Sequence, residues 1–579
     1  MTVTLYLAPT TAAALDHASA LARSAQAHRL ARASFLLPTG DAIHQLRRWL
    51  GDAMGVHLLQ FYNLGSALLA RADSTVREMS DTATRRLVHA LLSEAVVRGD
   101  LTTFAPVWDK PGFTAVLVEW LREMKTQGIL PQDVTAYALD AGNDRDRQLA
   151  LLYDRYQAFL QGSGCADADG LLWLAAEALE NDAWLSMETG HLLVVGFDQF
   201  SPIQLRILEA LASRLPQVSI YLLWDAAQRA DSLALSRLSG TRDALMAALA
   251  PRVEWLGETA GSPSTLDHVR RTLFEADGRQ IVDGTPPAIV AVAAPSREGE
   301  VRWALRTIKK MLLDGVSLEQ IALLAPHPDA YAAIVAAVAG EYGVPVSGEL
   351  ELAHAPAAAA LFNLIRLAPD FPWRATFDAL RSPYIEQSWL TAAQIELLDR
   401  LTRERPVVAG RDQWRFALQP IAHRGGDEAF DADEDVGSPP LAATVPPEEL
   451  AAIEAGLMAF FDHLSPPPSA THHAYTLWVQ EALLGLYTGE EEDGALAGRP
   501  TLGMLHRCRE GAYAERDLAA LGAVLHGLRD LVQAADLTLP GQDRIVSWEA
   551  YRTDVLEILP KVCLRSDPTH LAVRFGPLE

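Results

Sequence analysis

The first place where this sequence could do chemistry is the turn after its first apolar segment, residues 3–7. A loop that binds nucleotide phosphates there would follow the pattern GxxxxGK[ST]. Its glycines let backbone N–H groups approach the phosphates, its lysine neutralises them, and its hydroxyl holds Mg²⁺. The residues at these positions are Ala8 and Ala13 for the glycines, Ala14 for the lysine and Leu15 for the hydroxyl. The sequence therefore predicts an ordinary strand-to-helix turn that binds no nucleotide.

The acidic pair that would orient Mg²⁺ and the attacking water is missing as well. It should close the apolar segment 191–195, where Val195 and Gly196 stand instead. Asp198 follows two to three residues too late and is expected to cap the next helix. Because the residues of the phosphate-binding loop and the acidic pair are both missing, the pattern indicates an inactivated nucleotide motor.

Other residues with metal or nucleophile chemistry give weaker signals. His472 and His473 would point about 100° apart on a helix, so a surface pair is expected rather than a metal site. Cys165, Cys508 and Cys563 are too scattered for a zinc motif or a disulfide framework, and buried free thiols are expected. The sequence has no GxSxG or HExxH motif to anchor a hydrolase. We expect no metal and no cofactor in this chain.

Length and composition indicate a large, modular and folded protein. At roughly 150 residues per domain, 579 residues predict about four domains. With 49% hydrophobic and 21% charged residues, a largely disordered chain is excluded. No apolar run reaches the 18 or so residues of a membrane-spanning helix, and no basic segment precedes the short apolar stretch at the N-terminus, so a cytoplasmic location is expected.

The net charge of −25 argues against a protein whose whole surface binds nucleic acid, although it leaves room for a local basic channel. Acidic residues cluster in 427–435 (DEAFDADED) and 490–493 (EEED), which are expected to be solvated loops.

The elements that must position these residues alternate between strands and helices, so the predicted fold class is α/β with parallel sheets. Helical periodicity interrupts this alternation twice, and a last strand, 570–575, ends the second α/β block before its sheet is complete. The predicted organisation is a first α/β domain (1–80 with 190–260), a helical insertion (81–189), a linker (261–287), a second α/β domain (288–356 with 565–579) and a second helical insertion (357–564) that contains an acidic loop (425–447).

An ordered set of short stretches resembles the AddB-type, or RexB-type, subunit of bacterial ATP-dependent helicase–nuclease complexes. The stretches are 36–40 (LLPTG), 111–113 (PGF) with 120–125 (WLREMK), 153–156 (YDRY) with Asp167 and Asp169, 196–204 (GFDQFSPIQ), 293–300 (AAPSREGE), 321–324 (IALL), 343–345 (GVP) and 380–384 (LRSPY). The resemblance implies a UvrD-like superfamily 1 helicase fold, with two RecA-like domains, whose motor is degenerate.

The resemblance also implies what lies outside this sequence. Members of the family continue into a PD-(D/E)xK nuclease domain that uses Mg²⁺ and carries a 4Fe–4S cluster bound by four cysteines. This chain is expected to be truncated before that domain and to have no nuclease activity. The implied partners are single- or double-stranded DNA ends and an active, AddA-like helicase–nuclease subunit.

DNA binding is the function that remains after these losses. The candidate contacts combine charge with an aromatic ring at the ends of the strands, where α/β sheets present ligands: Arg47 and Arg48 beside Trp49, and Arg381 with Tyr384. Trp49 itself is expected to lie in the core. The favoured function is a non-catalytic, helicase-like DNA-binding scaffold in double-strand-break repair. The alternatives are an active ATP-dependent DNA helicase, and a protein-interaction module with a relic motor fold.

Overall fold

The computed structural model describes residues 2–26, 32–51, 55–182, 185–224, 236–257, 289–420, 441–486, 502–511, 513–538, 545–565 and 572–577. The chain forms two compact units, 1–296 and 297–579. Both contain helices and parallel strands, which confirms the predicted α/β class. The predicted linker 261–287 and most of the predicted acidic loop 425–447 lie outside the described residues. The domain boundaries within each unit stay predictions.

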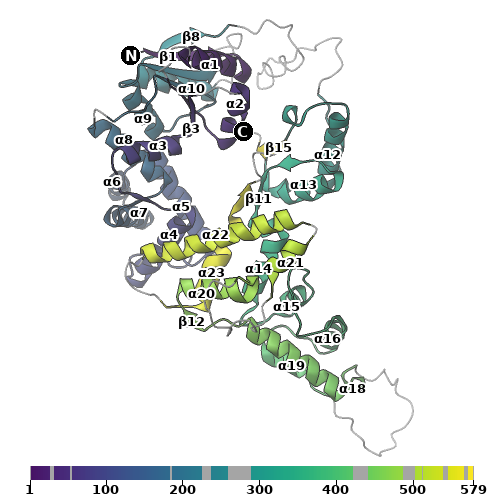
Figure 1. Ribbon diagram of the computed structural model, residues 1–579. Coiled ribbons are helices and arrows are strands. Elements are labelled where there is room, and N and C mark those ends of the chain that lie inside the picture. Colours follow the sequence, from purple (N-terminus) through teal and green to yellow (C-terminus); the bar gives the residue numbers. More distant parts are fainter. Residues whose placement is uncertain are drawn as a thin grey trace, which may run out of the picture. The chain divides into compact units, whose positions relative to one another are not determined.

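The first unit is built on a six-stranded, fully parallel sheet with the strand order β3-β2-β6-β7-β1-β8 (Figure 1). Its strands are β1 (Thr2–Ala8), β2 (Ala33–Leu36), β3 (Val56–Leu59), β6 (His191–Val194), β7 (Gln217–Leu223) and β8 (Arg252–Trp255). All four residues of β2 and all four of β6 are buried. Such continuous burial is typical of parallel strands covered on both faces, and it explains their near-continuous apolar sequences.

Helices cover both faces of this sheet. On one face, α1 (Thr11–Gln26) and α2 (Gly40–Leu50) pack over a core that includes Tyr6, Phe35 and Leu193. The other face packs against four helices, α3 (Phe61–Arg71), α8 (Ala168–Asn181), α9 (Pro202–Ala212) and α10 (Ser236–Leu249). The alternation of in-facing and out-facing residues along β1 divides its side chains between these two cores.

Between β3 and β6 the chain forms a helical group. Its helices are α4 (Asp81–Val97), α5 (Pro111–Thr126), α6 (Pro131–Ala141) and α7 (Asp144–Ser163). A two-residue parallel ladder joins β4 (Arg77–Glu78) to β5 (Cys165–Ala166) at the two ends of this group. Because α8 packs on both α3 and α5, it connects the helical group to the sheet.

The second unit contains a three-stranded parallel sheet with the order β10-β15-β9: β10 (Val346–Ser347), β15 (Val573–Pro577) and β9 (Ala322–Ala325). The last strand of the chain is therefore the central one. Its residues Val573 and Phe575 are buried against α12 (Arg297–Leu313) and α13 (Asp329–Tyr342). At the start of the predicted second α/β domain, the described residues 289–293 form no strand.

The rest of the second unit is helical and shares one large core, in which Trp414 and Phe461 are completely buried. Two short antiparallel ladders brace it, β11 (Glu349–Glu351) with β14 (Cys563–Arg565) and β12 (Ser469–Ala470) with β13 (Val546–Ser547). The helices are α14 (Pro356–Leu367), α15 (Trp373–Leu380), α16 (Ala392–Glu404), α17 (Arg411–Leu418), α18 (Leu441–Thr444), α19 (Pro447–His463), α20 (His472–Trp478), α21 (Met504–Glu510), α22 (Ala514–Thr538) and α23 (Trp548–Ile558).

The prediction of an exposed His472–His473 pair is wrong for His472. This residue is 4% exposed, and its Nε2 lies 3.0 Å from a carboxylate oxygen of Asp554 on α23. The bond satisfies a polar group that burial would otherwise leave without a partner.

No helix within the described ranges is both long enough and apolar enough to cross a membrane.

Candidate nucleotide and nucleic-acid sites

The carboxyl edge of the first sheet is where an α/β protein would bind a nucleotide. At the end of β1, the Thr10 hydroxyl oxygen accepts a hydrogen bond from Ala13 N–H (3.1 Å), and the Thr10 carbonyl accepts one from Ala14 N–H (3.1 Å). These two donors at the start of α1 are therefore satisfied by the chain itself rather than offered to an anion.

The side chains in this turn face the wrong way for phosphate. Ala14, at the position of the motif lysine, is 3% exposed and packs into the core between the sheet and α1. Leu15 packs partly buried against the same core. A cation at residue 14 would point into apolar surroundings, so the residues present do not fit Mg²⁺–ATP.

The turn after β6 is closed by packing. Val195 is 2% exposed and lies in the core beneath α1 and α2. Gly196 has φ = +88°, and a Cβ atom on it would lie 3.3 Å from Cδ of Pro38. The proline ring after β2 therefore sits directly against the backbone where an acidic residue would be needed, and only glycine combines this φ with this close approach.

Asp198 does not cap α9, contrary to the prediction. The cap is Ser201, whose hydroxyl accepts from Gln204 N–H in a reciprocal capping box. The carbonyl of Asp198 instead accepts a hydrogen bond from the Thr241 hydroxyl (2.6 Å) on α10.

Aromatic rings fill the remaining space near this edge. Phe197 lies 5.4 Å from Phe61 and 5.0 Å from Phe200 between ring centroids. After β7, the guanidinium of Arg242 lies 4.7 Å from the Trp224 ring centroid. Residues 225–228, where an Asp and a Gln resemble a helicase coupling motif, lie outside the described residues.

The cysteines do not fit a four-cysteine cluster. Cys165 and Cys508 are buried, and burial raises the pKa of the Cys508 thiol to about 11. Cys563 is exposed on β14, so the expectation that all three thiols are buried is wrong for this one. In the part of the chain that the structure describes, no group of three or more His, Cys, Asp or Glu side chains could hold a metal ion.

The first pair of DNA-contact candidates is exposed at the end of α2. This helix buries Leu46 and Leu50, four residues apart, so Arg47, Arg48 and Trp49 are turned to solvent. Trp49 is 46% exposed, and the prediction that it lies in the core is wrong. Since α2 starts where β2 ends and runs back along the sheet, these three residues lie toward the opposite edge from the closed nucleotide site.

The second pair of candidates is engaged in internal contacts. Arg381 donates from Nη2 to Glu396 and to Asp399, each at 2.9 Å, and its guanidinium lies 5.1 Å from the Phe377 ring centroid. Hydrogen bonds from Arg403 and then Arg381 lower the pKa of the Asp399 carboxyl. Tyr384 is half-buried, and its hydroxyl accepts from Arg516 (3.3 Å).

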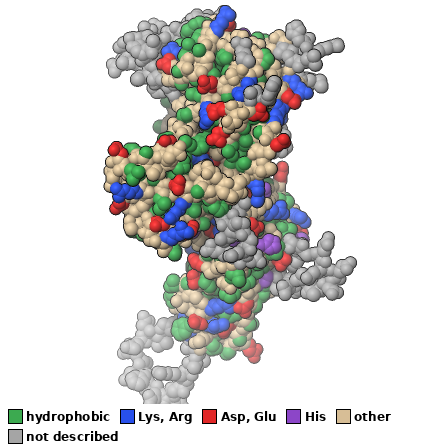
Figure 2. Space-filling model, turned by 90° about the vertical axis from the view of Figure 1, so that its left-hand side faces the viewer, with side chains coloured by type: hydrophobic (Ala, Val, Ile, Leu, Met, Phe, Trp, Pro, Cys, Tyr) green, Lys and Arg blue, Asp and Glu red, His purple; other side chains and the backbone are tan. Residues whose placement is uncertain are grey.

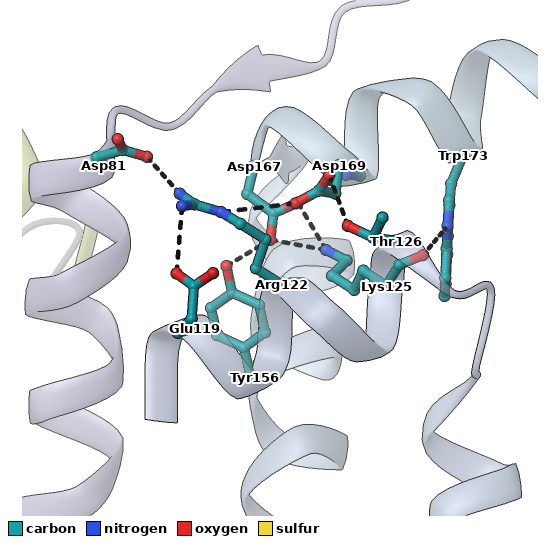
Figure 3. Close-up of polar contacts among 10 residues, drawn as sticks. Asp81, Glu119, Arg122, Lys125, Thr126, Tyr156, Asp167, Asp169 and Trp173 are labelled. Carbon is teal, nitrogen blue, oxygen red and sulfur yellow. Dashed lines mark hydrogen bonds and ion pairs between the residues drawn. The ribbon is translucent and has the colours of Figure 1, made fainter. Parts of the chain in front are cut away.

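Sequence reasoning missed a polar network that joins three helices of the first unit (Figure 3). Lys125 on α5 is 1% exposed, and its Nζ lies 2.7 Å from both carboxylate oxygens of Asp167. Tyr156 on α7 donates its hydroxyl to the same carboxylate (2.6 Å). Asp167 is also the N-cap of α8, where it accepts from Gly170 N–H (2.7 Å).

A second carboxylate completes this network. Asp169 contacts Arg122 (3.9 Å) and the Thr126 hydroxyl (3.4 Å), and burial followed by the neighbouring Asp167 charge raises its pKa. Arg122 also contacts the carboxylates of Asp81 (3.1 Å) and Glu119 (3.5 Å). Both cations are therefore paired with carboxylates, and the arrangement locks α5, α7 and α8 together rather than offering a reactive group. Lys125 at the spacing of the buried Leu117 and Leu121 was a signal for it, because a lysine on the apolar face of a helix needs a partner.

On the face shown in Figure 2, basic and acidic side chains are interspersed rather than gathered into one basic surface. Contacts with nucleic acid would therefore depend on local groups of cations.

Residues 47–245 match the family model described as ADDB, N-terminal. Over these residues the chain is similar to AddB-type proteins. Its curated relatives are named as subunits of an ATP-dependent helicase/deoxyribonuclease. The protein from Symbiobacterium thermophilum is 26% identical over 428 residues, which cover 67% of this chain and 36% of the relative.

Two further relatives carry the same name. The protein from Desulforudis audaxviator is 26% identical, covering 55% of this chain and 28% of its own length. The protein from Bacillus velezensis is 24% identical, covering 55% and 29%. The chain thus spans about a third of the length of the curated relatives it matches.

Proposed function

We propose that this chain is a non-catalytic, helicase-like DNA-binding scaffold within a cytoplasmic helicase–nuclease that processes double-strand breaks. In this proposal an active, AddA-like partner supplies ATP hydrolysis, and this chain itself binds neither nucleotide nor metal. The names of the relatives support the helicase–nuclease context, since each is called a subunit of an ATP-dependent helicase/deoxyribonuclease.

The observation that carries the proposal is the closed carboxyl edge of the first sheet. Pro38 packs against Gly196, Val195 is buried where an acid is needed, and Ala14 faces the core where a cation is needed. Stabilising the charge of a transferring phosphoryl group requires cations and Mg²⁺ ligands at these positions. A protein that keeps this fold without these groups can still bind DNA on its surface, but it has no groups to hydrolyse ATP.

The exposed group Arg47, Arg48 and Trp49 is the proposed DNA contact of the first unit. It combines two cations with an aromatic face, the chemistry that holds phosphates and stacks bases. Arg381 and Tyr384 support DNA binding less well, because Arg381 already pairs with two carboxylates.

The test is a fluorescence anisotropy titration of labelled single-stranded dT20 with the purified chain. It is carried out at several salt concentrations, with and without ATP and Mg²⁺. We expect the logarithm of the binding constant to fall linearly with the logarithm of the salt concentration. We expect ATP and Mg²⁺ to leave the binding unchanged. ATP-dependent binding or hydrolysis would replace the scaffold with an active helicase. Absence of binding at low salt would leave only the protein-interaction module.

A further inference from the structure

Helix α12 of the second unit carries an unusual concentration of positive charge. It contains five basic residues and two acidic ones, Arg297, Arg302, Arg306, Lys309 and Lys310 against Glu298 and Glu300, which gives +3 in a chain whose net charge is −25. Among the helices that the structure describes, none is more basic.

The helix presents part of this charge in a stripe beside an aromatic ring. Its inner face buries Val301, Leu305 and Ile308 in the core beneath the sheet. On its outer face, Trp303, Arg306 and Lys310 are exposed, and their spacing of three and four residues places them in one row. Trp303 is 41% exposed, so a large part of its apolar ring faces solvent.

Among the cations of α12, neighbouring acids pair with Arg302 but not with this row. Arg302 pairs with Glu298 on its own helix (2.8 Å) and Glu341 on α13 (2.6 Å). Arg306 lies 3.5 Å from the hydroxyl of Tyr342 on α13. Within the described ranges, neither Arg306 nor Lys310 forms an ion pair with a carboxylate. Positive charge therefore remains beside Trp303.

We propose that the outer face of α12 binds a single nucleic-acid strand, with a base stacked on Trp303 and phosphates held by Arg306 and Lys310. A single strand fits better than a duplex because stacking on a side chain requires an unpaired base face. This inference rests on the proposed function and adds to it a second contact surface, in the second unit.

The test uses the full chain and labelled dT20, with two variants of α12. W303A should weaken binding about 5- to 100-fold while leaving the salt dependence unchanged, because it removes stacking and no charge. R306Q/K310Q should reduce the slope of log K against log salt by about 1.4, since each lost phosphate contact contributes about 0.7. The control is R415Q/F416A on α17, which removes an exposed cation and aromatic ring elsewhere in the same unit and should change neither quantity.

The outcomes separate this inference from the proposed function. If the unaltered chain does not bind dT20, the proposed function fails and this inference fails with it. If the unaltered chain binds and both α12 variants bind equally well, with circular dichroism melting curves unchanged, only the α12 site is overturned. If poly-glutamate of equal charge displaces dT20 from the unaltered chain as well as unlabelled dT20 does, an acidic protein segment replaces nucleic acid as the partner.

Discussion

Lys125 Nζ lies 2.7 Å from both carboxylate oxygens of Asp167, 42 positions later in the sequence, and the lysine side chain is 1% exposed (Figure 3). The pair ties α5 to the first turn of α8. Since α8 also packs on α3 beside the sheet, the pair contributes to the attachment of the helical group to the rest of the first unit.

Removing the lysine charge should destabilise the chain strongly. K125M keeps most of the length of the side chain but leaves the Asp167 carboxylate without its cation, and breaking a buried pair in this way costs about 3–5 kcal/mol. Urea unfolding followed by circular dichroism measures the change. K110M makes the same substitution at an exposed lysine that pairs with Asp109 at 3.5 Å, and it should cost less than about 0.5 kcal/mol. Equal effects of the two substitutions would contradict the structural role of the network.

Burial of His191 should make stability depend on pH. The residue is 4% exposed, its Nε2 lies 2.8 Å from the Ser219 hydroxyl, and burial lowers its pKa from 6.5 to about 4. In the unfolded chain the His191 side chain binds a proton near pH 6.5, whereas in the folded chain it binds one only near pH 4. The stabilising contribution of His191 is therefore fully present above pH 6.5 and is lost as the pH falls toward 4.

The double variant H191L/S219A isolates this effect. It removes both partners, so no buried hydroxyl is left without a hydrogen bond. Between pH 7 and pH 4.5 it should lose about 2 kcal/mol less unfolding free energy than the unaltered chain. Parallel pH profiles for the two proteins would show that His191 is not the titrating group.

Gly196 should tolerate no side chain. G196A places a Cβ atom 3.3 Å from Pro38 Cδ and forces alanine into a positive φ, which together should cost about 1–2 kcal/mol. The matched control is G162A in α7, where a Cβ atom meets nothing within 4 Å. That substitution should leave stability unchanged or raise it by about 0.5–1 kcal/mol. The thermal melting temperatures of both variants provide the comparison.

The two pairs of predicted DNA contacts should respond differently to mutation. R47Q/R48Q should reduce the salt slope of dT20 binding by about 1.4 and change stability by less than about 0.5 kcal/mol, because both side chains are exposed. R381Q should leave the slope unchanged and cost about 1 kcal/mol of stability, because Asp399 loses one of its two arginine partners. The reverse pattern would assign DNA binding to Arg381.

The three thiols should react at different rates. At pH 8, one equivalent of Ellman's reagent should react quickly with the exposed Cys563. Cys165 and Cys508 should react only on unfolding, and the raised pKa of Cys508 lowers its thiolate fraction further. In C563S the fast phase should disappear. A fast phase that persists in this variant would mean that a buried thiol becomes accessible in the native protein.

Some features could be read from the sequence because they depend on residue type and local periodicity. The prediction that residues 14 and 195 cannot take part in phosphate chemistry needs no coordinates, since no alanine or valine can do the chemistry of lysine or aspartate. The alternation of predicted strands and helices predicted an α/β fold with parallel sheets, and the structure confirms this class.

Other features were set by contacts between distant segments. Trp49 was expected in the core, but Leu46 and Leu50 already fill the buried face of α2. His472 was expected at the surface, yet its partner Asp554 lies 82 residues away. Burial of a single side chain depends on which helix packs over it, and that information is not local.

The difference between local and non-local information also separates the predicted nucleotide site from the contacts made by tertiary packing. Residue identity alone predicts that the nucleotide machinery is missing, because that prediction needs only a few positions of the chain. Three-dimensional packing was needed to show that Pro38 closes against Gly196, that Lys125 meets Asp167, and that Trp303 shares an exposed row with Arg306 and Lys310. Each of these depends on side-chain placement, which the packing of whole helices and strands sets.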